Sequence, residues 1–233
     1  MTKLETLLKE ISENKRCADI EKAFEEVAIE LIQNSILVAG NFKYFIREIE
    51  FYFWSLHHPD PYVHKKNRQL EFGEWYFHSS GRKGLDLTFG NKENKNYGGI
   101  LLRGIENIEK NEKAKPLNGP SKIVNLLSEN IGKDEVVRLS KIIGKSVFFN
   151  ESILRVEHFE KSQNIPLPTM RHGLTLKPNG GIKFAVKEYR YIYPSSEYKF
   201  PRKEIFVTEW VKNEKIKEEE GWALLNYRKN FNL

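Results

Sequence analysis

The chain has 233 residues, which is enough for one domain with a substantial apolar core. Apolar residues make up 39% and charged residues 30%, and this balance excludes an intrinsically disordered chain. The net charge of +6 favours a polyanionic partner, and the lack of any apolar run of about eighteen residues argues against a membrane-spanning helix.

Two helices are predicted within residues 2–34. Apolar side chains recur at helical spacing first over residues 4–11 and again over residues 20–32. The single cysteine, Cys17, lies between them and can form no intramolecular disulfide. The start of the chain also lacks the apolar stretch of a signal peptide, so we expect a cytoplasmic protein.

A β-hairpin is predicted next. The apolar run Ser35–Ala39 is followed by a Gly40-Asn41 turn and by the long aromatic stretch Phe42–Trp54. Further strands are predicted over residues 73–78, 84–89 and 98–103, with polar loops over residues 91–97 and 109–117. These segments together predict the main sheet.

A third helix is predicted to begin near residue 118, because Asn118-Gly119-Pro120-Ser121 forms a capped start before an apolar periodic segment. Strands are predicted to return over residues 169–192, including residues 181–186 and 188–192. The charged segment 212–220 is predicted to be a solvated helix or tail.

The predicted fold is α+β, in a single domain over residues 1–233. A curved, mostly antiparallel β-sheet is flanked by helices. The N-terminal helices occupy residues 2–34. The sheet and the active site occupy residues 35–106, and a helix with C-terminal strands occupies residues 118–210.

Each predicted strand has one apolar and one polar face, because successive side chains point to opposite sides. The polar faces carry Glu, Tyr, His, Asp and Arg, which are more typical of a pocket than of a solvated surface. They are Glu48, Glu50 and Tyr52 in the hairpin, Tyr76 and His78 in the next strand, then Asp86, Thr88 and Arg103. A polar face that meets only water is the simpler interpretation of any one strand.

Five segments, within a region spanning residues 20–192, resemble motifs of the alkyladenine (3-methyladenine) DNA glycosylase family. I-L-L-R-G-I-E at residues 100–106 is similar to the family's V-L-L-R-A-L-E strand, and N-G-P-S-K at residues 118–122 to its S-G-P-S-K helix start. R-E-I-E-F-Y at residues 47–52 resembles V-E-T-E-A-Y, D-P-Y-V-H at residues 60–64 resembles D-x-x-x-H, and G-E-W-Y-F-H at residues 73–78 resembles G-T-L-Y-V-Y. The resemblance implies a glycosylase-like fold and hydrolysis of the N-glycosidic bond of a flipped base, without metal or other cofactor.

The resemblance also implies residue roles. Glu50 would be the general base that activates water, and Arg103 would orient Glu50 and the water. The base pocket would comprise Tyr52, His64, Tyr76, His78, Asp86 and Thr88, with Asp86 and Thr88 testing the edge of the base. DNA phosphates would be held by Lys65, Lys66, Arg68, Arg82, Lys83, Ser121 and Lys122.

Three positions depart from the family pattern. The family's intercalating tyrosine falls near Gly81. His78 replaces a tyrosine and Thr88 an asparagine, so the hydrogen-bond pattern of the base pocket differs. The identity of the excised base, whether alkylated, deaminated or hypermodified, therefore stays open.

Two other functions fit the same residues. His57, His58, Asp60 and His64 could be the divalent-metal ligands of a nuclease. Alternatively, the sheet could be a non-catalytic stacking platform for single-stranded nucleic acid. For the glycosylase we expect a monofunctional, monomeric enzyme that acts on duplex or single-stranded DNA, because no lysine lies on the polar strand faces.

Overall fold

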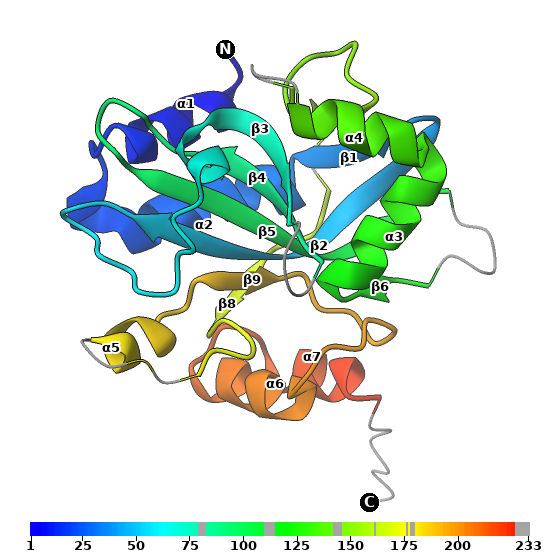
Figure 1. The fold of residues 1–233 in the computed structure, drawn as a ribbon. Helices are drawn as coiled ribbons and strands as arrows, with labels where there is room; N and C mark the ends of the chain where they lie inside the picture. Colours follow the sequence, from blue (N-terminus) through cyan, green and yellow to red (C-terminus); the bar gives the residue numbers. More distant parts are fainter. Residues whose placement is uncertain are drawn as a thin grey trace, which may run out of the picture.

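One β-sheet contains nine strands of the described residues in the computed structural model (Figure 1). The structure describes residues 1–78, 83–109, 115–141, 146–160, 162–175, 177 and 180–226. The strands are β1 (Ser35–Ala39), β2 (Phe42–Trp54), β3 (Phe72–Phe77), β4 (Leu85–Phe89), β5 (Tyr97–Asn107), β6 (Leu117–Asn118), β7 (Leu154–His158), β8 (Leu167–Thr169) and β9 (Arg190–Ile192). Six of them follow the order β3-β4-β5-β2-β1-β7, β6 pairs with β5, and β9 pairs with both β2 and β8.

Neighbouring strands of the sheet are antiparallel, and the sheet is strongly curved into a half-barrel (Figure 1). Its two longest strands, β2 and β5, run side by side through the middle, with register shifts between Ile46 and Ile49. Such a bulge bends a strand and increases its twist. The predicted α+β single domain with a curved antiparallel sheet is confirmed.

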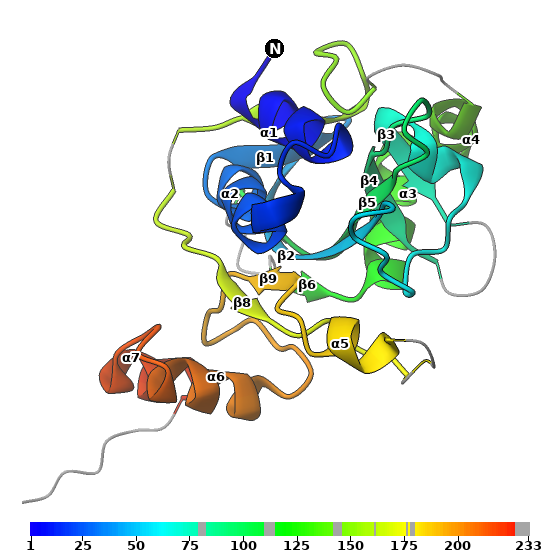
Figure 2. The ribbon, with the colours of Figure 1, turned by 90° about the vertical axis from the view of Figure 1, so that its left-hand side faces the viewer.

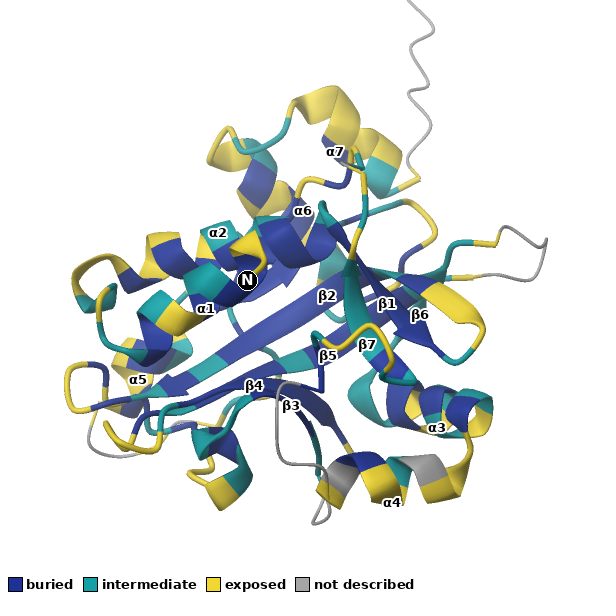
Figure 3. Ribbon diagram, turned by 90° about the horizontal axis from the view of Figure 1, so that it is seen from above, coloured by how far each residue is buried: buried dark blue, intermediate teal, exposed yellow. Residues whose placement is uncertain are grey.

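Helices α1 (Lys3–Ser12) and α2 (Ile20–Ile32) cover one face of the sheet (Figure 3). A capping box between Thr2 and Glu5 begins α1. The ring of Phe24 on α2 stacks on Phe51 of β2, with 4.4 Å between the ring centroids. After the register shift, the apolar side chains of Ile49, Phe51 and Phe53 therefore lie on the face that these helices cover, and Glu50 and Tyr52 lie on the other face.

Helices α3 (Pro120–Ile131) and α4 (Lys133–Lys141) flank the sheet on another side (Figure 1). Pro120 occupies the first turn of α3, where its missing N–H costs no hydrogen bond. Gly132, with φ of +85°, separates the two helices, and a left-handed φ favours glycine. The predicted helix start near residue 118 is confirmed.

The last part of the chain, called here the C-terminal layer, lies below the six central strands in Figures 1 and 2 and contains β8, β9, α5 (Gly181–Ala185), α6 (Lys203–Lys212) and α7 (Glu218–Leu224). Through β9, which pairs with β2, this layer is joined to the sheet. Tyr198, Phe206 and Trp210 belong to a second apolar cluster in this layer. Two short 3-10 helices, η1 (Cys17–Asp19) and η2 (Asn67–Leu70), complete the elements. Among the helices in the described ranges, none has the length and apolar character needed to cross a bilayer.

Two predictions for the C-terminal layer are wrong. Residues 181–186 are not a strand, because Gly181–Ala185 is α5, which follows Gly180 in the left-handed conformation. The carbonyl of Phe184 accepts a hydrogen bond from the Arg171 side chain at 3.2 Å instead of pairing with a strand. Residues 212–220 are not one helix or tail, since they contain the end of α6, a turn and the start of α7.

Candidate functional site

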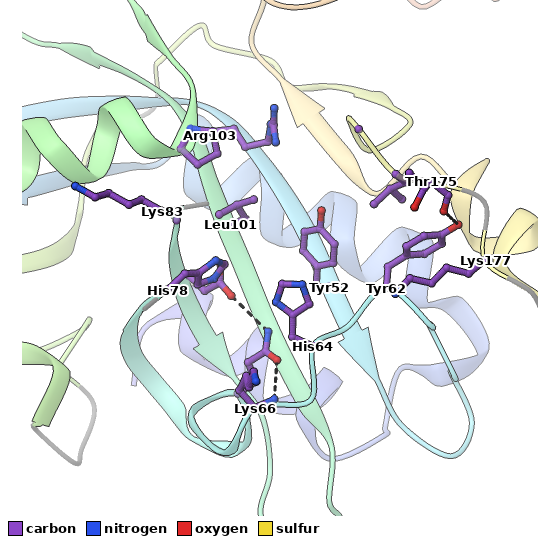
Figure 4. A pocket seen from close by; sticks show the side chains of 16 residues that line it. Tyr52, Tyr62, His64, Lys66, His78, Lys83, Leu101, Arg103, Thr175 and Lys177 are labelled. Carbon is purple, nitrogen blue, oxygen red and sulfur yellow. Dashed lines mark hydrogen bonds and ion pairs between the residues drawn. The ribbon is translucent and has the colours of Figure 1, made fainter. Parts of the chain in front are cut away.

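A pocket of about 700 Å³ opens on the sheet face that the even-numbered side chains of β2 occupy (Figure 4). Strands β2, β4 and β5, the loop after β2, residues 173–175 and Lys177 build its wall. The lining side chains include Tyr52, Tyr62, His64, Lys66, Gln69, His78, Lys83, Asp86, Leu101, Arg103 and Lys177. Ligand pockets commonly combine such rings with a few polar groups, and this volume lies in their usual range.

One row of side chains crosses the sheet beneath the pocket. Tyr76 is paired with Asp86, Asp86 with Leu101, and Leu101 with Glu50. Directly paired residues of antiparallel strands point to the same face. The structure therefore brings the carboxyl groups of Asp86 and Glu50 to one face, on either side of Leu101.

Glu50 is fully buried next to two residues of the pocket wall. Its Oε2 accepts a hydrogen bond from the Tyr52 hydroxyl at 2.9 Å and one from Arg103 Nη1 at 3.4 Å. Its Oε1 accepts a hydrogen bond from the backbone N–H of His172 at 2.7 Å. Burial and the charge of Glu50 raise the pKa of Tyr52, so the tyrosine stays protonated and donates.

Glu48, two residues earlier on the same strand, fixes the position of Arg103. Its Oε1 accepts hydrogen bonds from Arg103 Nε and Arg190 Nε, both at 2.8 Å. Its Oε2 accepts hydrogen bonds from Asn118 Nδ2 at 2.7 Å and from the Tyr198 hydroxyl at 2.6 Å. Burial raises the pKa of this carboxyl, but Arg190, Arg103 and Tyr198 outweigh burial and lower the pKa. Glu48 is therefore a buried carboxylate.

The two carboxylates and two guanidiniums form one buried charge cluster of Glu48, Glu50, Arg103 and Arg190. Arg103 contacts both carboxylates, which raise its pKa despite burial. Arg190 is fully buried and lies over the ring of Phe206, 5.6 Å from the ring centroid. The attraction between opposite charges offsets part of the free-energy cost of burying them.

A second acid–base pair, His78 and Asp86, lies in the wall of the pocket. His78 Nε2 is 3.0 Å from Asp86 Oδ1. Asp86 Oδ2 accepts a hydrogen bond from Gln69 Nε2 at 3.4 Å. The ring of His64 lies 6.0 Å from the ring of His78, which places two imidazoles side by side in the wall (Figure 4).

Rings and lysines surround the opening. The guanidinium of Arg171 lies 4.8 Å from the Tyr52 ring centroid and 5.3 Å from that of Tyr62. Lys66, Lys83 and Lys177 line the wall from loops and strand ends. Lysines next to aromatic rings are suited to a ligand that carries both phosphate and an aromatic ring.

Several predicted site residues lie elsewhere. Thr88 is buried, and its hydroxyl donates to the carbonyl of Glu74 and accepts from the N–H of Glu74, both at 3.1 Å. The prediction that Thr88 tests a base edge therefore has no support in the structure. Tyr76 contacts His78, with 4.8 Å between rings, but does not line the pocket.

The predicted phosphate-binding residues in the described part of the chain are spread over four places. Lys65 lies over the Trp54 ring at 3.5 Å, and Arg68 pairs with Glu74 at 2.8 Å. The Ser121 hydroxyl donates to the carbonyl of Lys83 at 3.2 Å, so the start of α3 adjoins the pocket. Lys122 lines a separate cavity between α3 and β5. Arg82 and Gly81 lie outside the described residues.

The residues of the metal-nuclease hypothesis are engaged in other contacts. The two ring nitrogens of His58 contact the carbonyl of Phe53 at 2.9 Å and the hydroxyl of Tyr189 at 2.8 Å. Asp60 forms a fully buried ion pair with Arg171 at 2.6 Å. In the part of the chain that the structure describes, no group of three or more His, Cys, Asp and Glu is placed to hold a metal. These four residues therefore do not form the proposed metal centre.

Sequence reasoning missed the residues that reach the site from the C-terminal layer. Arg171, Arg190 and Tyr198 come from segments more than 100 residues after the strands that they contact. Strand alternation pointed to Glu48 but gave no role for it. A buried tyrosine or arginine in a short strand or a loop has no sequence signal for its partner, because the pairing depends on tertiary packing.

The fold and the site define an α+β protein with a polar, ring-lined pocket over one face of a curved antiparallel sheet. No family model matches the chain. The chain is 30% identical over 207 residues to an uncharacterized protein of Acanthamoeba polyphaga mimivirus, in a match that covers 77% of this chain and 89% of that protein. The chain belongs to the same protein family as this mimivirus protein.

Proposed function

We propose that this protein is a monofunctional DNA N-glycosylase that hydrolyses the N-glycosidic bond of a base flipped into the pocket. The observation that carries the proposal is the contact of Arg103 with the buried carboxylate of Glu50 at the wall of the pocket. A carboxylate held by a guanidinium is suited to bind and deprotonate water. The motif resemblance around Glu50 and Arg103 supports the same roles.

The pocket is suited to an extruded base. Tyr52, Tyr62 and the two imidazoles of His64 and His78 offer flat surfaces for stacking. The lysines of the wall supply positive charge for the phosphates that flank a flipped nucleotide. Water reaches Glu50 only when one of its contacts with Tyr52, Arg103 or His172 opens, because the carboxylate is fully buried.

We infer that no lysine acts as the nucleophile, because neither β4 nor β5 carries a lysine and two of the three lysines of the pocket wall are held by acceptors. Lys83 Nζ donates to Asn125 Oδ1 at 2.8 Å, and Lys177 Nζ donates to the carbonyl of Pro61 at 2.8 Å. A Schiff base would require one of these amines to leave its acceptor and lose its proton. The expected product is therefore an intact strand that contains an abasic site.

In the direct test, the protein is incubated with a panel of oligonucleotides that carry different modified bases. Strand cleavage is then measured with and without treatment with alkali. We expect strand breaks at one or more modified bases only after alkali. Glu50→Gln keeps the size of the side chain and removes the base, so release should slow by about 100-fold or more while binding persists. The matched control is Glu157→Gln, on β7, where Glu157 pairs with Arg155 outside the pocket.

Three results would contradict the proposal. Binding without release from any member of the panel would favour a non-catalytic binding module. Strand breaks that need a divalent ion and disappear with chelator would favour a nuclease. Base release that is equally fast in the wild type and in Glu50→Gln would show that Glu50 is not the general base.

A further inference from the structure

Two glycines keep space for the pair His78 and Asp86. A Cβ at Gly84 would lie 2.7 Å from His78 Nδ1, and a Cβ at Gly99 would lie 2.7 Å from Asp86 Oδ2. Glycine inside or beside a strand costs stability, so a position that retains it has a packing or functional reason. Because Gly84 also lines the pocket, the missing Cβ leaves room for a ligand atom beside the second ring nitrogen of His78.

The surroundings of His78 favour its charged form. Burial lowers its pKa, but the contact with Asp86 outweighs burial, and the pKa is raised above 6.5. Burial and the charge of His78 lower the pKa of His64. The groups around His78 are Asp86 on β4, Tyr76 on β3 and His64 in the loop after β2, with Lys66, Lys83 and Lys177 in the same wall. Two neighbouring imidazoles with pKa values shifted apart are typical of acid–base assignments.

We propose that His78, held by Asp86, is the general acid that protonates the departing base, and that the substrates are nucleobases that are uncharged before release. This inference rests on the proposed glycosylase function and adds the class of base. Asp86 and Glu50 stand on either side of Leu101 in one row across the sheet. The acid and the base therefore meet a bound nucleotide from two sides.

The N–H bond of the His78 imidazolium breaks and its proton passes to a ring nitrogen of the base. The bond between C1′ of the sugar and the base breaks, and its electron pair stays on the base, which leaves neutral. Water forms the new bond to C1′ and gives its proton to Glu50. A base with a fixed positive charge leaves neutral without this proton, so it does not need His78.

The test compares hypoxanthine, an uncharged purine, with N7-methylguanine, whose ring carries a fixed positive charge, in single-turnover release from matched oligonucleotides. His78→Gln and Asp86→Asn should slow hypoxanthine release by about 100-fold or more, and N7-methylguanine release by less than about tenfold. His158→Gln is the control, because His158 is an exposed histidine of β7 outside the pocket.

A second readout uses the wild type alone and does not depend on how the variants fold. Release of hypoxanthine should fall as the pH rises through the raised pKa of His78, while release of N7-methylguanine should lack this fall. Equal losses in the release rates of the two bases, or equal pH profiles, would overturn the role of His78. The proposed glycosylase function would be unaffected by these results. A wild type that releases only N7-methylguanine would also overturn the role of His78. A wild type that releases no base from any oligonucleotide would overturn both proposals.

Discussion

Glu48 receives four side-chain hydrogen bonds, and two of them come from the C-terminal residues Arg190 and Tyr198. Arg103 uses its Nε for Glu48 and its Nη1 for Glu50, so the first contact sets the direction of the second. Glu48 and Tyr198 are therefore positioning residues, which act on the proposed chemistry through Arg103.

Tyr198→Phe removes one hydrogen bond to a buried carboxylate and keeps the ring in its apolar cluster. We expect a loss of about 2 kcal/mol in the free energy of unfolding, since hydrogen bonds to charged groups contribute about 1.5–3 kcal/mol. Urea denaturation measures this loss. Tyr193→Phe is the control, because the half-buried Tyr193 ring packs against Arg47 and is not one of the four side-chain donors to Glu48. Equal stability of the two variants would contradict the role of the Tyr198 hydroxyl.

The lowered pKa of Glu48 predicts a pH dependence of stability. A carboxyl whose pKa is lower in the folded chain stabilises the fold fully above its ordinary pKa of 4.5, and this stabilisation is lost as the pH falls through the lower, folded value. Glu48→Gln should therefore cost about 3 kcal/mol of unfolding free energy near neutral pH. The difference from wild type should narrow below pH 4.5 in urea titrations. A difference that stays constant down to acid unfolding would show that the charge of Glu48 contributes nothing.

At the scale of the strand, β5 approaches the C-terminal layer closely at Gly104. A Cβ at this position would overlap the Tyr198 hydroxyl and lie 2.9 Å from the Cβ of Glu48. Gly104→Ala should therefore cost about 1–3 kcal/mol of unfolding free energy through overpacking, although alanine normally suits a strand better than glycine.

A double-variant cycle tests this explanation. Gly104→Ala displaces the same hydroxyl that Tyr198→Phe removes. The double variant should therefore lose less unfolding free energy than the sum of the losses in the two single variants. Gly104→Ala combined with Tyr193→Phe should instead be additive, as expected for sites without shared contacts. Additivity in both pairs would show that the new methyl group does not act on Tyr198.

The sequence predicted the strands that carry Glu50, Tyr52, Asp86 and Arg103. Apolar and polar residues alternate around Glu50 and Asp86, and branched residues precede Arg103. The same alternation placed these side chains on one face, as the contact between Arg103 and Glu50 requires. The alternation could not exclude Thr88, whose hydroxyl turns to the backbone of β3. Residues 181–186 failed for a related reason, since a short apolar run can be a helical turn or a strand.

At the scale of the molecule, the positions of the lysines say more about a ligand than the net charge of +6 does. Lys66 and Lys177 line the pocket, whereas Lys9 and Lys15 pair with Glu13 near α1. For DNA binding, each lost phosphate contact should reduce the slope of log K against log salt by about 0.9.

The double variant Lys66→Ala/Lys177→Ala should therefore weaken DNA binding and reduce the salt slope by about 1 to 2. Fluorescence anisotropy at several salt concentrations measures both quantities. Lys9→Ala/Lys15→Ala has the same change in net charge and should leave the slope near that of the wild type. Equal slopes for the two double variants would mean that total charge, and not the pocket, attracts DNA.

The C-terminal layer was the least predictable part of the fold. Its strands β8 and β9 have three residues each, and β9 joins the sheet beside β2 although about 140 residues separate their pairing positions. Contacts of such sequence separation leave no local pattern, and loop closure makes them slow to form. A single sequence could therefore predict the wall of the pocket but not the layer that braces it.

The hydrogen bonds from Arg190 and Tyr198 to Glu48 have a consequence during synthesis. A ribosome that has released only the first 165 residues has delivered β1 to β7, but neither Arg190 nor Tyr198. The nascent chain then holds a carboxylate without two of its four donors, so the cluster cannot assemble early. Competence for the proposed reaction would therefore appear only after the final third of the polypeptide has emerged and docked.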